Sequence, residues 1–295
     1  MDSTAVISTI ENTVTVSISD NGRQTSSTAP DTVQSVLETF HRDGVVIIRN
    51  AVPHTSLDHL RTKMTADCLH LLTKRENPHF NHGKAAQNLS QNLPVSPEYL
   101  HDGIWANEYA IVVIENILGP HPQLAFVGAN TALPHGVGRQ AVHSDAYFPH
   151  LDFAFGVEVN IFLDDASADN GVTELWLGSH VGTNFKDQVP NTRGRIKKPL
   201  LDARAAVSPP IQPTVPKGSI VLRDLRTWHA GMPNRSSTLR IMLGFIFFPA
   251  WYRTSMRVTF PLSAKGVVES WKGADFVATA QFVDGKVDYQ TCRSK

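Results

Sequence analysis

Short apolar segments, separated by turns of Gly, Pro, Asn and Asp, recur through the chain from residue 123 onward. They cover residues 124–133, 140–148, 155–163, 174–177, 218–222 and 239–248. Short strands at such spacing are typical of an antiparallel sandwich or barrel. All-β barrels often exceed about 200 residues as one unit. A chain of 295 residues can therefore hold the whole pattern in a single, mainly β domain.

The first third of the chain shows helical periodicity instead. Residues 31–42, 56–72 and 104–118 carry apolar side chains at helical spacing, which predicts three helices. Residues 45–48 are four consecutive β-branched apolar residues and predict a buried strand. The polar stretch 74–103 is rich in Asn, His and Pro, and it predicts a long loop over the functional site.

The N-terminus differs in composition from the rest of the chain. Residues 1–28 are rich in Ser and Thr, so we expect a flexible arm followed by a single domain over 29–295. Within the arm, residues 13–18 alternate well enough for an edge strand, and the sequence leaves both possibilities open.

Charge and cysteine content restrict the partners. Lys plus Arg equals Asp plus Glu at 27 each, so we expect neither a nucleic acid nor a membrane surface as partner. The two cysteines, Cys68 and Cys292, form no disulfide framework and fit a reducing compartment. The N-terminus lacks an apolar secretory region, and the longest apolar run, 241–252, is too short for a membrane span. We therefore expect a cytoplasmic protein that acts on a small molecule.

The segment His143-Ser144-Asp145 carries the most specific chemistry. In an extended segment, residues i and i+2 point to the same face, so His143 and Asp145 would share one spot. His229, from a distant strand, could complete a set of two imidazoles and one carboxylate. That set is the facial triad of non-haem Fe(II) oxygenases. A lone His-x-Asp is common by chance in a chain with 13 histidines, so the assignment as metal ligands depends on the motifs around it.

Arg240 adds a fixed cation eleven positions after His229. It alternates with Leu239, Ile241 and Leu243, so it faces opposite this apolar set, toward the lumen of a barrel. A lumenal arginine needs an anion, and a guanidinium suits the bidentate binding of a carboxylate. Arg223 lacks that spacing, and we interpret it as structural.

The motifs in their order resemble the phytanoyl-CoA dioxygenase family of Fe(II)/2-oxoglutarate-dependent oxygenases. The resemblance rests on residues 43–48, 140–145, 170–180 and 217–219, then on Trp228-His229-Ala230-Gly231-Met232-Pro233-Asn234-Arg235-Ser236 followed by Arg240. It covers roughly residues 30–255 and is nearest to the fungal branch that tailors secondary metabolites such as meroterpenoids and alkaloids.

The resemblance implies a fold and a set of cofactors. The fold is a double-stranded β-helix, a jelly-roll or cupin-like barrel with flanking N-terminal α-helices. The cofactors are Fe(II), the cosubstrate 2-oxoglutarate and O2. Relatives of this kind often form homodimers, and we expect one here, with the apolar run 245–251 as a possible contact patch.

The resemblance also assigns residues. His143, Asp145 and His229 would be the metal ligands and the catalytic centre, and Arg240 would bind the C5 carboxylate of 2-oxoglutarate. Gln140, Thr173 and Gln91 would be polar contacts to the cosubstrate. For Phe148 and Trp176, core packing is the first expectation from the sequence; a place in the wall of the substrate pocket is the alternative, and it is favoured more for Phe148.

Two other classes remain open. A cupin-like metal-dependent isomerase or hydrolase could use the same two histidines and aspartate, but it would not need Arg240 or Gln140. A catalytically silent binding member of the fold would not need a complete triad. The carboxylate of Asp145 favours hydroxylation, desaturation, epoxidation, rearrangement or endoperoxidation over halogenation, and the sequence does not choose among these.

Overall fold

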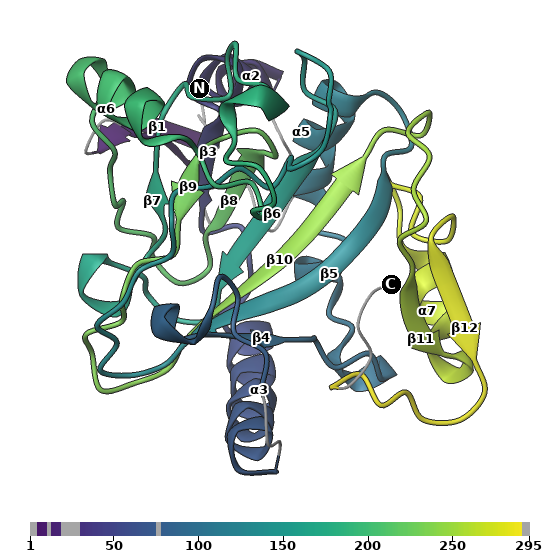
Figure 1. The fold of residues 1–295 in the computed structure, drawn as a ribbon. Coiled ribbons are helices and arrows are strands. Elements are labelled where there is room, and N and C mark those ends of the chain that lie inside the picture. Colours follow the sequence, from purple (N-terminus) through teal and green to yellow (C-terminus); the bar gives the residue numbers. More distant parts are fainter. Residues whose placement is uncertain (1–4, 11–12, 19–29, 75–77, 291–295) are drawn as a thin grey trace.

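The computed structural model describes residues 5–10, 13–18, 30–74 and 78–290. Its centre is a sheet of eight strands in the order β1-β2-β3-β8-β6-β10-β5-β4. These are β1 Ala5–Ile10, β2 Thr13–Ile18, β3 Val45–Arg49, β8 Ile220–Asp224, β6 Val157–Phe162, β10 Arg240–Phe248, β5 Gln123–Ala132 and β4 Asn88–Gln91. The pairing of β2 with β3 is parallel, and the other pairings in this sheet are antiparallel. The long strands β6, β10 and β5 run side by side across the molecule (Figure 1).

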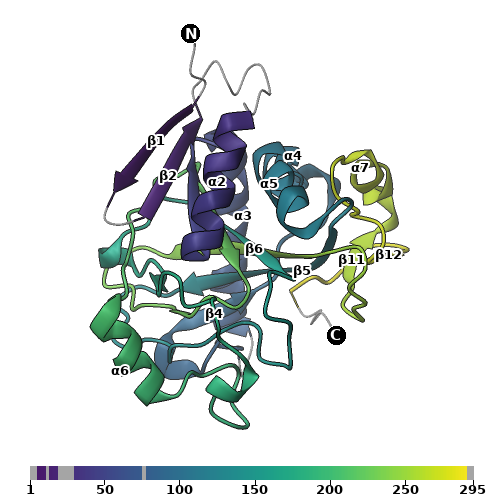
Figure 2. The same ribbon diagram turned by 90° about the horizontal axis from the view of Figure 1, so that it is seen from above.

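Two smaller sheets accompany the main one. Strand β7 Glu174–Leu175 pairs antiparallel with β9 His229–Ala230, and β11 Val258–Pro261 pairs parallel with β12 Ala280–Val283. The helices are α2 Pro30–Asp43, α3 His54–Lys74, α4 Asp102–Trp105, α5 Glu108–Leu118, α6 Lys198–Val207 and α7 Lys265–Ser270. Seen from above, α2, α4 and α5 lie on one side of the main sheet and α6 lies on the other (Figure 2).

The two faces of the main sheet differ in character, as strand β10 shows. Ile241, Leu243 and Phe245 belong to the large apolar core between the sheet and the helices. Arg240 and Met242 alternate with them and line a cavity on the opposite face. Strict alternation along one strand therefore separates the stabilising core from the functional face.

Most of the expected elements are present at the expected places. The helices predicted over 31–42 and 56–72 are α2 and α3, and the buried strand over 45–48 is β3. The neighbours of β3 explain its unbroken apolar run: Val46 and Ile48 pack against the helices, and Val45 and Ile47 pack in a second apolar cluster on the other face. The mainly β, cupin-like fold that the motifs imply is confirmed.

Two predicted elements are wrong in detail. The single helix expected over 104–118 is interrupted, and α5 begins anew after Asn107. The side chain of Asn107 accepts hydrogen bonds from the backbone of Tyr109 at 3.1 Å and Ala110 at 3.2 Å, as an N-cap does. The strand expected over 140–148 is an irregular segment, apart from isolated β-bridges at His143.

Some expectations concern the ends of the chain. Residues 13–18 form β2, whereas residues 1–4, 11–12 and 19–29 of the expected arm, and Cys292, lie outside the described residues. The flexible arm and the domain boundary at residue 29 stay predictions. In the run 245–251, Phe245, Phe247 and Phe248 are buried in the core, and Trp251 is 55% exposed. The run therefore offers one aromatic side chain to the surface, not an apolar patch.

Cys68 is a buried free thiol. Among the helices that the structure describes, none has the length and hydropathy needed to cross a bilayer.

Candidate active site

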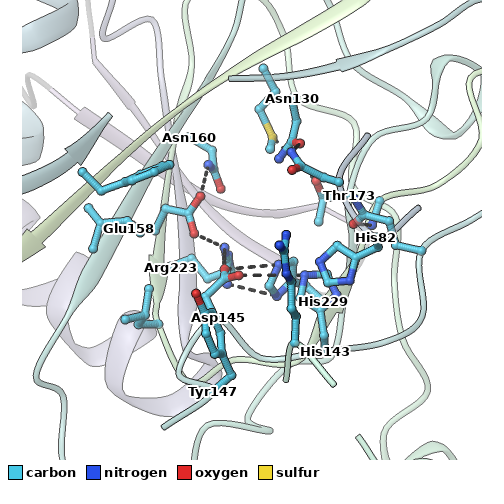
Figure 3. A pocket seen from close by; sticks show the side chains of 18 of the residues that line it. His82, Asn130, His143, Asp145, Tyr147, Glu158, Asn160, Thr173, Arg223 and His229 are labelled. Atoms are coloured by element: carbon cyan, nitrogen blue, oxygen red, sulfur yellow. Dashed lines mark hydrogen bonds and ion pairs between the residues drawn. The ribbon is translucent and has the colours of Figure 1, made fainter. Parts of the chain in front are cut away.

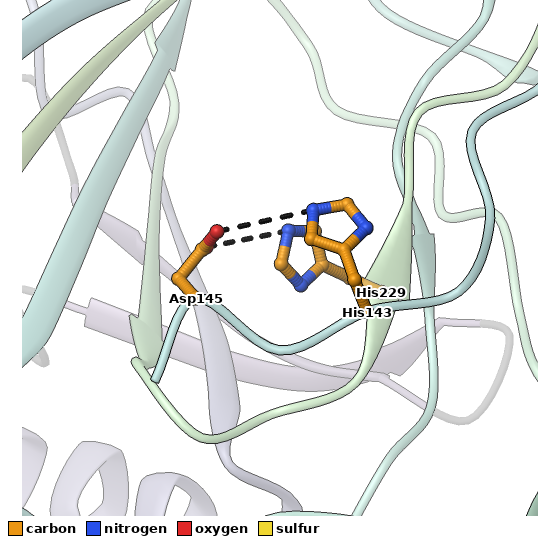
Figure 4. Close-up of side chains that lie close together, drawn as sticks. All are labelled: His143, Asp145 and His229. Atoms are coloured by element: carbon orange, nitrogen blue, oxygen red, sulfur yellow. Dashed lines mark ion pairs between the residues drawn. The ribbon is translucent and has the colours of Figure 1, made fainter. Parts of the chain in front are cut away.

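Three metal-binding side chains meet on the cavity face of the main sheet. One ligand atom from each of His143, Asp145 and His229 lies within 4.8 Å of the others. The Asp145 Oδ1 atom is 3.8 Å from Nε2 of His143, and Oδ2 is 3.3 Å from Nε2 of His229 (Figure 4). Two imidazole nitrogens and one carboxylate oxygen on one side are the donor set that non-haem Fe(II) prefers. The triad expected from the sequence is therefore assembled in space.

Backbone pairing brings these residues together. The amide of His143 donates to the carbonyl of His229 at 2.9 Å, and the amide of His229 donates to the carbonyl of His143, also at 2.9 Å. Asp145 follows in an irregular segment that is held on two sides: Ser144 N donates to Gly194 O at 3.0 Å, and Ala146 N donates to Leu225 O at 3.2 Å. An isolated β-bridge and single backbone hydrogen bonds thus position His143 and Asp145, where a continuous strand was expected.

Second contacts orient both rings. Nδ1 of His143 lies 2.8 Å from the Ala141 carbonyl, and Nδ1 of His229 lies 3.0 Å from the Thr227 carbonyl. An Nδ1–H that donates to a carbonyl leaves the Nε2 lone pair free for a metal. Arg223 Nη1 also lies 3.0 Å from Nδ1 of His229. Since a guanidinium only donates, this contact and the Thr227 bond belong to different tautomers, and the Thr227 bond belongs to the metal-competent one.

The charges in the cluster favour metal binding. Burial lowers the pKa of His143, and burial together with the positive charge of Arg223 lowers the pKa of His229 well below its ordinary value. Burial alone would raise the pKa of Asp145, but the neighbouring His229 and Arg223 lower it below its usual range. Two neutral imidazoles and an ionised carboxylate are the protonation states in which these groups ligate metals.

The cluster lies in a cavity of about 470 Å³. Strand β10 crosses it, with Arg240 and Met242 toward one end and Ile246 and Phe248 toward the other. The Arg240 end is polar, and the Phe248 end is apolar. The polar lining includes Asn88, Asn130, Gln140, Thr173 and Arg240, and the apolar lining includes Phe126, Phe148, Leu225, Ile246, Phe248 and Met256. Figure 3 shows Asn130 and Thr173 on this wall.

Arg240 is a buried cation without a carboxylate partner among the described residues. It is 2% exposed; Nη1 donates to Asn130 O at 3.2 Å and Nη2 donates to Asn88 Oδ1 at 3.3 Å. Its Nε is buried and has no hydrogen-bond partner. Burial lowers the pKa of Arg240 to about 10. Since an isolated buried charge is costly, a cavity-lining guanidinium in this state fits an anionic ligand.

The other expected contact residues divide into two groups. Gln140 and Thr173 line the cavity; the Gln140 side-chain oxygen accepts from Gly231 N at 2.8 Å. Gln91 is the expected residue that the structure does not bring to the cavity. Its amide is engaged within the fold, accepting from the hydroxyl of Thr131 and donating to Met64 O at 3.1 Å. Strand β4 contributes Asn88 to the lining instead.

The aromatic expectations also divide. Phe148 lines the cavity, as does Tyr147. Trp176 packs with Trp228 in a separate apolar cluster outside that cavity.

The sequence interpretation treated Arg223 as structural and left it out of the site, but the structure places its side chain in the cavity lining. Its Nη2 donates to Asp145 Oδ2 at 2.6 Å and also bonds Oε2 of Glu158 (Figure 3). The predicted strand ended at residue 222, one residue short of Arg223, whereas β8 continues to Asp224. In β8, Ile220 and Leu222 face the core, and Val221 faces the opposite side of the sheet. Had the predicted strand been extended by one residue, the same alternation would have placed Arg223 on the side of Val221, toward the cavity.

Glu158 and His82 also line the cavity and had no distinct sequence signal. Burial raises the pKa of Glu158 to about 7, although the charge of Arg223 opposes the shift. Burial lowers the pKa of His82 to about 4. Glu158 lies on β6, and His82 lies in the stretch between α3 and β4 that was expected to cover the site.

The match to a family model follows the same residues. Residues 40–242 match the model described as phytanoyl-CoA dioxygenase. The matched segment spans most of the chain, including the triad and Arg240, and the chain belongs to the phytanoyl-CoA dioxygenase family. The family expected from the motifs is confirmed.

Individual relatives are more distant. The chain is 27% identical over 158 residues to a probable alpha-ketoglutarate-dependent hypophosphite dioxygenase of Stutzerimonas stutzeri. That match covers 51% of this chain and 54% of the relative, so the chain spans about half the length of this curated relative.

Solved structures share the fold. The epimerase SnoN in complex with Fe3+, alpha ketoglutarate and nogalamycin RO superimposes with a TM-score of 0.58 at 16% identity, covering 77% of this chain and 88% of SnoN. The alpha ketoglutarate-dependent carbocyclase SnoK gives a TM-score of 0.54 at 17% identity, covering 74% of this chain and 84% of SnoK.

Proposed function

We propose that this chain is an Fe(II)/2-oxoglutarate-dependent oxygenase. One observation carries the proposal: the two-histidine, one-carboxylate cluster lines the same cavity as the buried cation Arg240, which has no carboxylate partner among the described residues. A metal alone would explain the cluster but not Arg240. A metal together with a dicarboxylate cosubstrate explains both.

Each group has a separate task. His143, Asp145 and His229 hold the iron, and the Arg240 guanidinium forms a forked pair with the C5 carboxylate of 2-oxoglutarate. Gln140 and Thr173 offer hydrogen bonds to the same cosubstrate. When bound, iron supplies the activation of O2 that couples decarboxylation of 2-oxoglutarate to succinate and CO2 with oxidation of the substrate.

The apolar end of the cavity supports an organic substrate. Phe126, Ile246, Phe248 and Met256 would pack against a carbon skeleton and exclude water from the reacting C–H bond. The substrate would be a secondary metabolite such as a meroterpenoid or an alkaloid. A small anion, such as the hypophosphite named for the relative, would leave this apolar surface uncovered. Hydroxylation, desaturation, epoxidation, rearrangement and endoperoxidation remain alternative outcomes.

Two rival functions make different demands on the cavity. A metal-dependent isomerase or hydrolase has no use for a buried arginine without an anion. A silent binding member of the fold has no use for a complete ligand set with neutral imidazoles.

Succinate formation tests the proposal. The protein is incubated with Fe(II), ascorbate and 2-oxoglutarate, with and without candidate apolar substrates, and succinate is measured. Asp145→Ala serves as the inactive control. Calorimetric titration of 2-oxoglutarate into the Mn(II)-loaded protein adds a readout that needs no substrate. An absence of both 2-oxoglutarate binding and succinate contradicts the proposal.

A further inference from the structure

Arg223 contacts two members of the metal cluster from outside it. Its Nη2 donates to Oδ2 of Asp145 at 2.6 Å, and its Nη1 lies 3.0 Å from Nδ1 of His229. The side chain is 3% exposed, so solvent does little to weaken its bond to Asp145. A guanidinium in this position affects which oxygen of Asp145 is free to coordinate a metal.

This guanidinium also has a partner within the main sheet. Arg223 on β8 and Glu158 on β6 are direct partners in the antiparallel register. Nη2 of Arg223 also donates to Oε2 of Glu158, and Oε1 of Glu158 accepts from Asn160 Nδ2 at 2.7 Å. Glu158 thus holds Arg223 from the neighbouring strand β6.

Both oxygens of Asp145 face the histidines. Oδ1 is 3.8 Å from the His143 Nε2 atom, and Oδ2 is 3.3 Å from the His229 Nε2 atom. A carboxylate with both oxygens near the ligand nitrogens could bind an ion through one oxygen or through two. The two oxygens differ because Oδ2 accepts a charge-assisted hydrogen bond from Arg223. A facial triad needs a carboxylate that uses one position, since the remaining positions must stay open.

We propose that Arg223 is a positioning residue that engages Oδ2 of Asp145, so that the carboxylate offers Oδ1 alone to the metal and a coordination position stays open for 2-oxoglutarate. This inference rests on the proposed function. It assigns Arg223 no contact with substrate or cosubstrate, and it makes Glu158 the anchor that keeps the guanidinium in place.

The proposal separates two affinities that a merely structural arginine would change together. Without the guanidinium, Asp145 can turn both oxygens to the cation. Metal binding is then retained or tightened, because a competing positive charge has gone. Binding of 2-oxoglutarate to the metal-loaded protein weakens, because the second oxygen occupies a position that the cosubstrate needs.

The experiment compares wild type with Arg223→Met. Mn(II) binding is titrated first, and 2-oxoglutarate is then titrated calorimetrically into the Mn(II)-loaded proteins. Removing an outer-sphere partner of a metal ligand typically costs roughly 10–100-fold in metal affinity or activity, and a merely structural Arg223 would show that loss in Mn(II) affinity. We expect instead that 2-oxoglutarate affinity falls by at least about tenfold, while Mn(II) affinity falls by no more than about threefold, which is below that range. Arg223→Lys keeps the charge without the planar fork and should restore part of the affinity.

Arg226→Met is the matched control. Arg226 lies just after β8, three residues beyond Arg223; it is 4% exposed and forms a buried pair with Asp224, with Nη2 to Oδ2 at 2.7 Å. It does not line the cavity. Its loss should lower thermal stability and leave 2-oxoglutarate affinity at the wild-type value.

A second variant guards against misfolding. Arg223→Met leaves Glu158 buried without its cation, so the double variant Arg223→Met/Glu158→Gln removes both charges and should fold. It should show the same selective loss of 2-oxoglutarate affinity. Unchanged 2-oxoglutarate affinity in the folded variants overturns the inference. So does a tenfold loss of Mn(II) affinity, or a loss of 2-oxoglutarate affinity in Arg226→Met that equals that of Arg223→Met. A wild-type protein that binds Mn(II) but no 2-oxoglutarate overturns the proposed function instead.

Discussion

The imidazole rings of His82 and His143 lie against each other, with centroids 3.8 Å apart and planes tilted by 39°. His82 has a positive φ of 57°, a left-handed conformation that is uncommon for a residue other than glycine. The polar stretch between α3 and β4 thus reaches the metal cluster itself (Figure 3). His143 belongs to the candidate ligand set, and His82 packs against its ring.

The two histidines should therefore respond differently to substitution. His143→Ala should weaken Mn(II) binding by more than the roughly 10–100-fold typical of an outer-sphere partner, and His82→Ala should weaken it by less. The reason is that the ligand atoms within 4.8 Å of one another come from His143, Asp145 and His229, not from His82. Metal titration followed by magnetic resonance checks this. Equal losses would place His82 among the ligands.

Removal of the carboxylate ligand should abolish turnover without unfolding the protein. In Asp145→Ala, Arg223 keeps its partner Glu158, so no buried charge is left alone. Thermal unfolding and near-ultraviolet circular dichroism should stay close to wild type, while succinate formation disappears. Turnover at the wild-type rate would remove Asp145 from the catalytic centre.

Arg240 should control cosubstrate binding and little else. Loss of a partner from a desolvated charge pair costs roughly 2–5 kcal/mol, so Arg240→Ala should nearly eliminate 2-oxoglutarate binding while Mn(II) still binds. Arg240→Lys should raise the KM for 2-oxoglutarate more than the KM for the substrate. The exposed Arg235 offers a control in Arg235→Ala. Calorimetry decides the point, and unchanged affinity in Arg240→Ala would rule out the assignment.

His82 should make stability depend on pH in a defined window. Its folded pKa of about 4 lies below the ordinary value of 6.5. Between these values the unfolded chain binds a proton that the folded protein does not, so stability falls as the pH drops from 6.5 toward 4. Glu158, with its raised pKa, acts in the opposite direction.

Comparison with His82→Gln isolates the contribution of this histidine. The difference in melting temperature between the metal-free wild type and His82→Gln should become less favourable to the wild type as the pH is lowered from 6.5 toward 4. Above pH 6.5 this difference should be constant. Parallel curves for the two proteins would show that His82 titrates normally.

Homodimer formation stays a prediction, now with a different candidate surface. Trp251 and Phe153 are each 55% exposed, and their ring centroids are 6.2 Å apart. We expect light scattering at micromolar concentration to give a dimeric mass, and Trp251→Ser to reduce it. A monomeric wild-type mass would contradict the expectation.

Local sequence patterns were sufficient for much of the fold. Helical spacing identified α2 and α3, and a run of β-branched residues identified β3, because these signals depend on neighbours in the chain. The metal cluster could also be inferred, since only a few combinations of side chains suit a facial triad. Asn107 shows the limit: an N-cap that divides one apolar stretch into α4 and α5 depends on backbone geometry.

Only the tertiary structure decided which polar side chains share the cavity. Gln91 and Asn88 lie three positions apart on β4, yet Gln91 bonds to Thr131 and Met64 while Asn88 reaches Arg240. Arg223 is a buried arginine like Arg226, and register alone sets it opposite Glu158 and beside Asp145. Strand register, backbone bridges and burial arise from contacts between distant segments. The sequence by itself determined which metal-binding and charged side chains the protein has, and the packing of distant segments determined which of them reach the cavity.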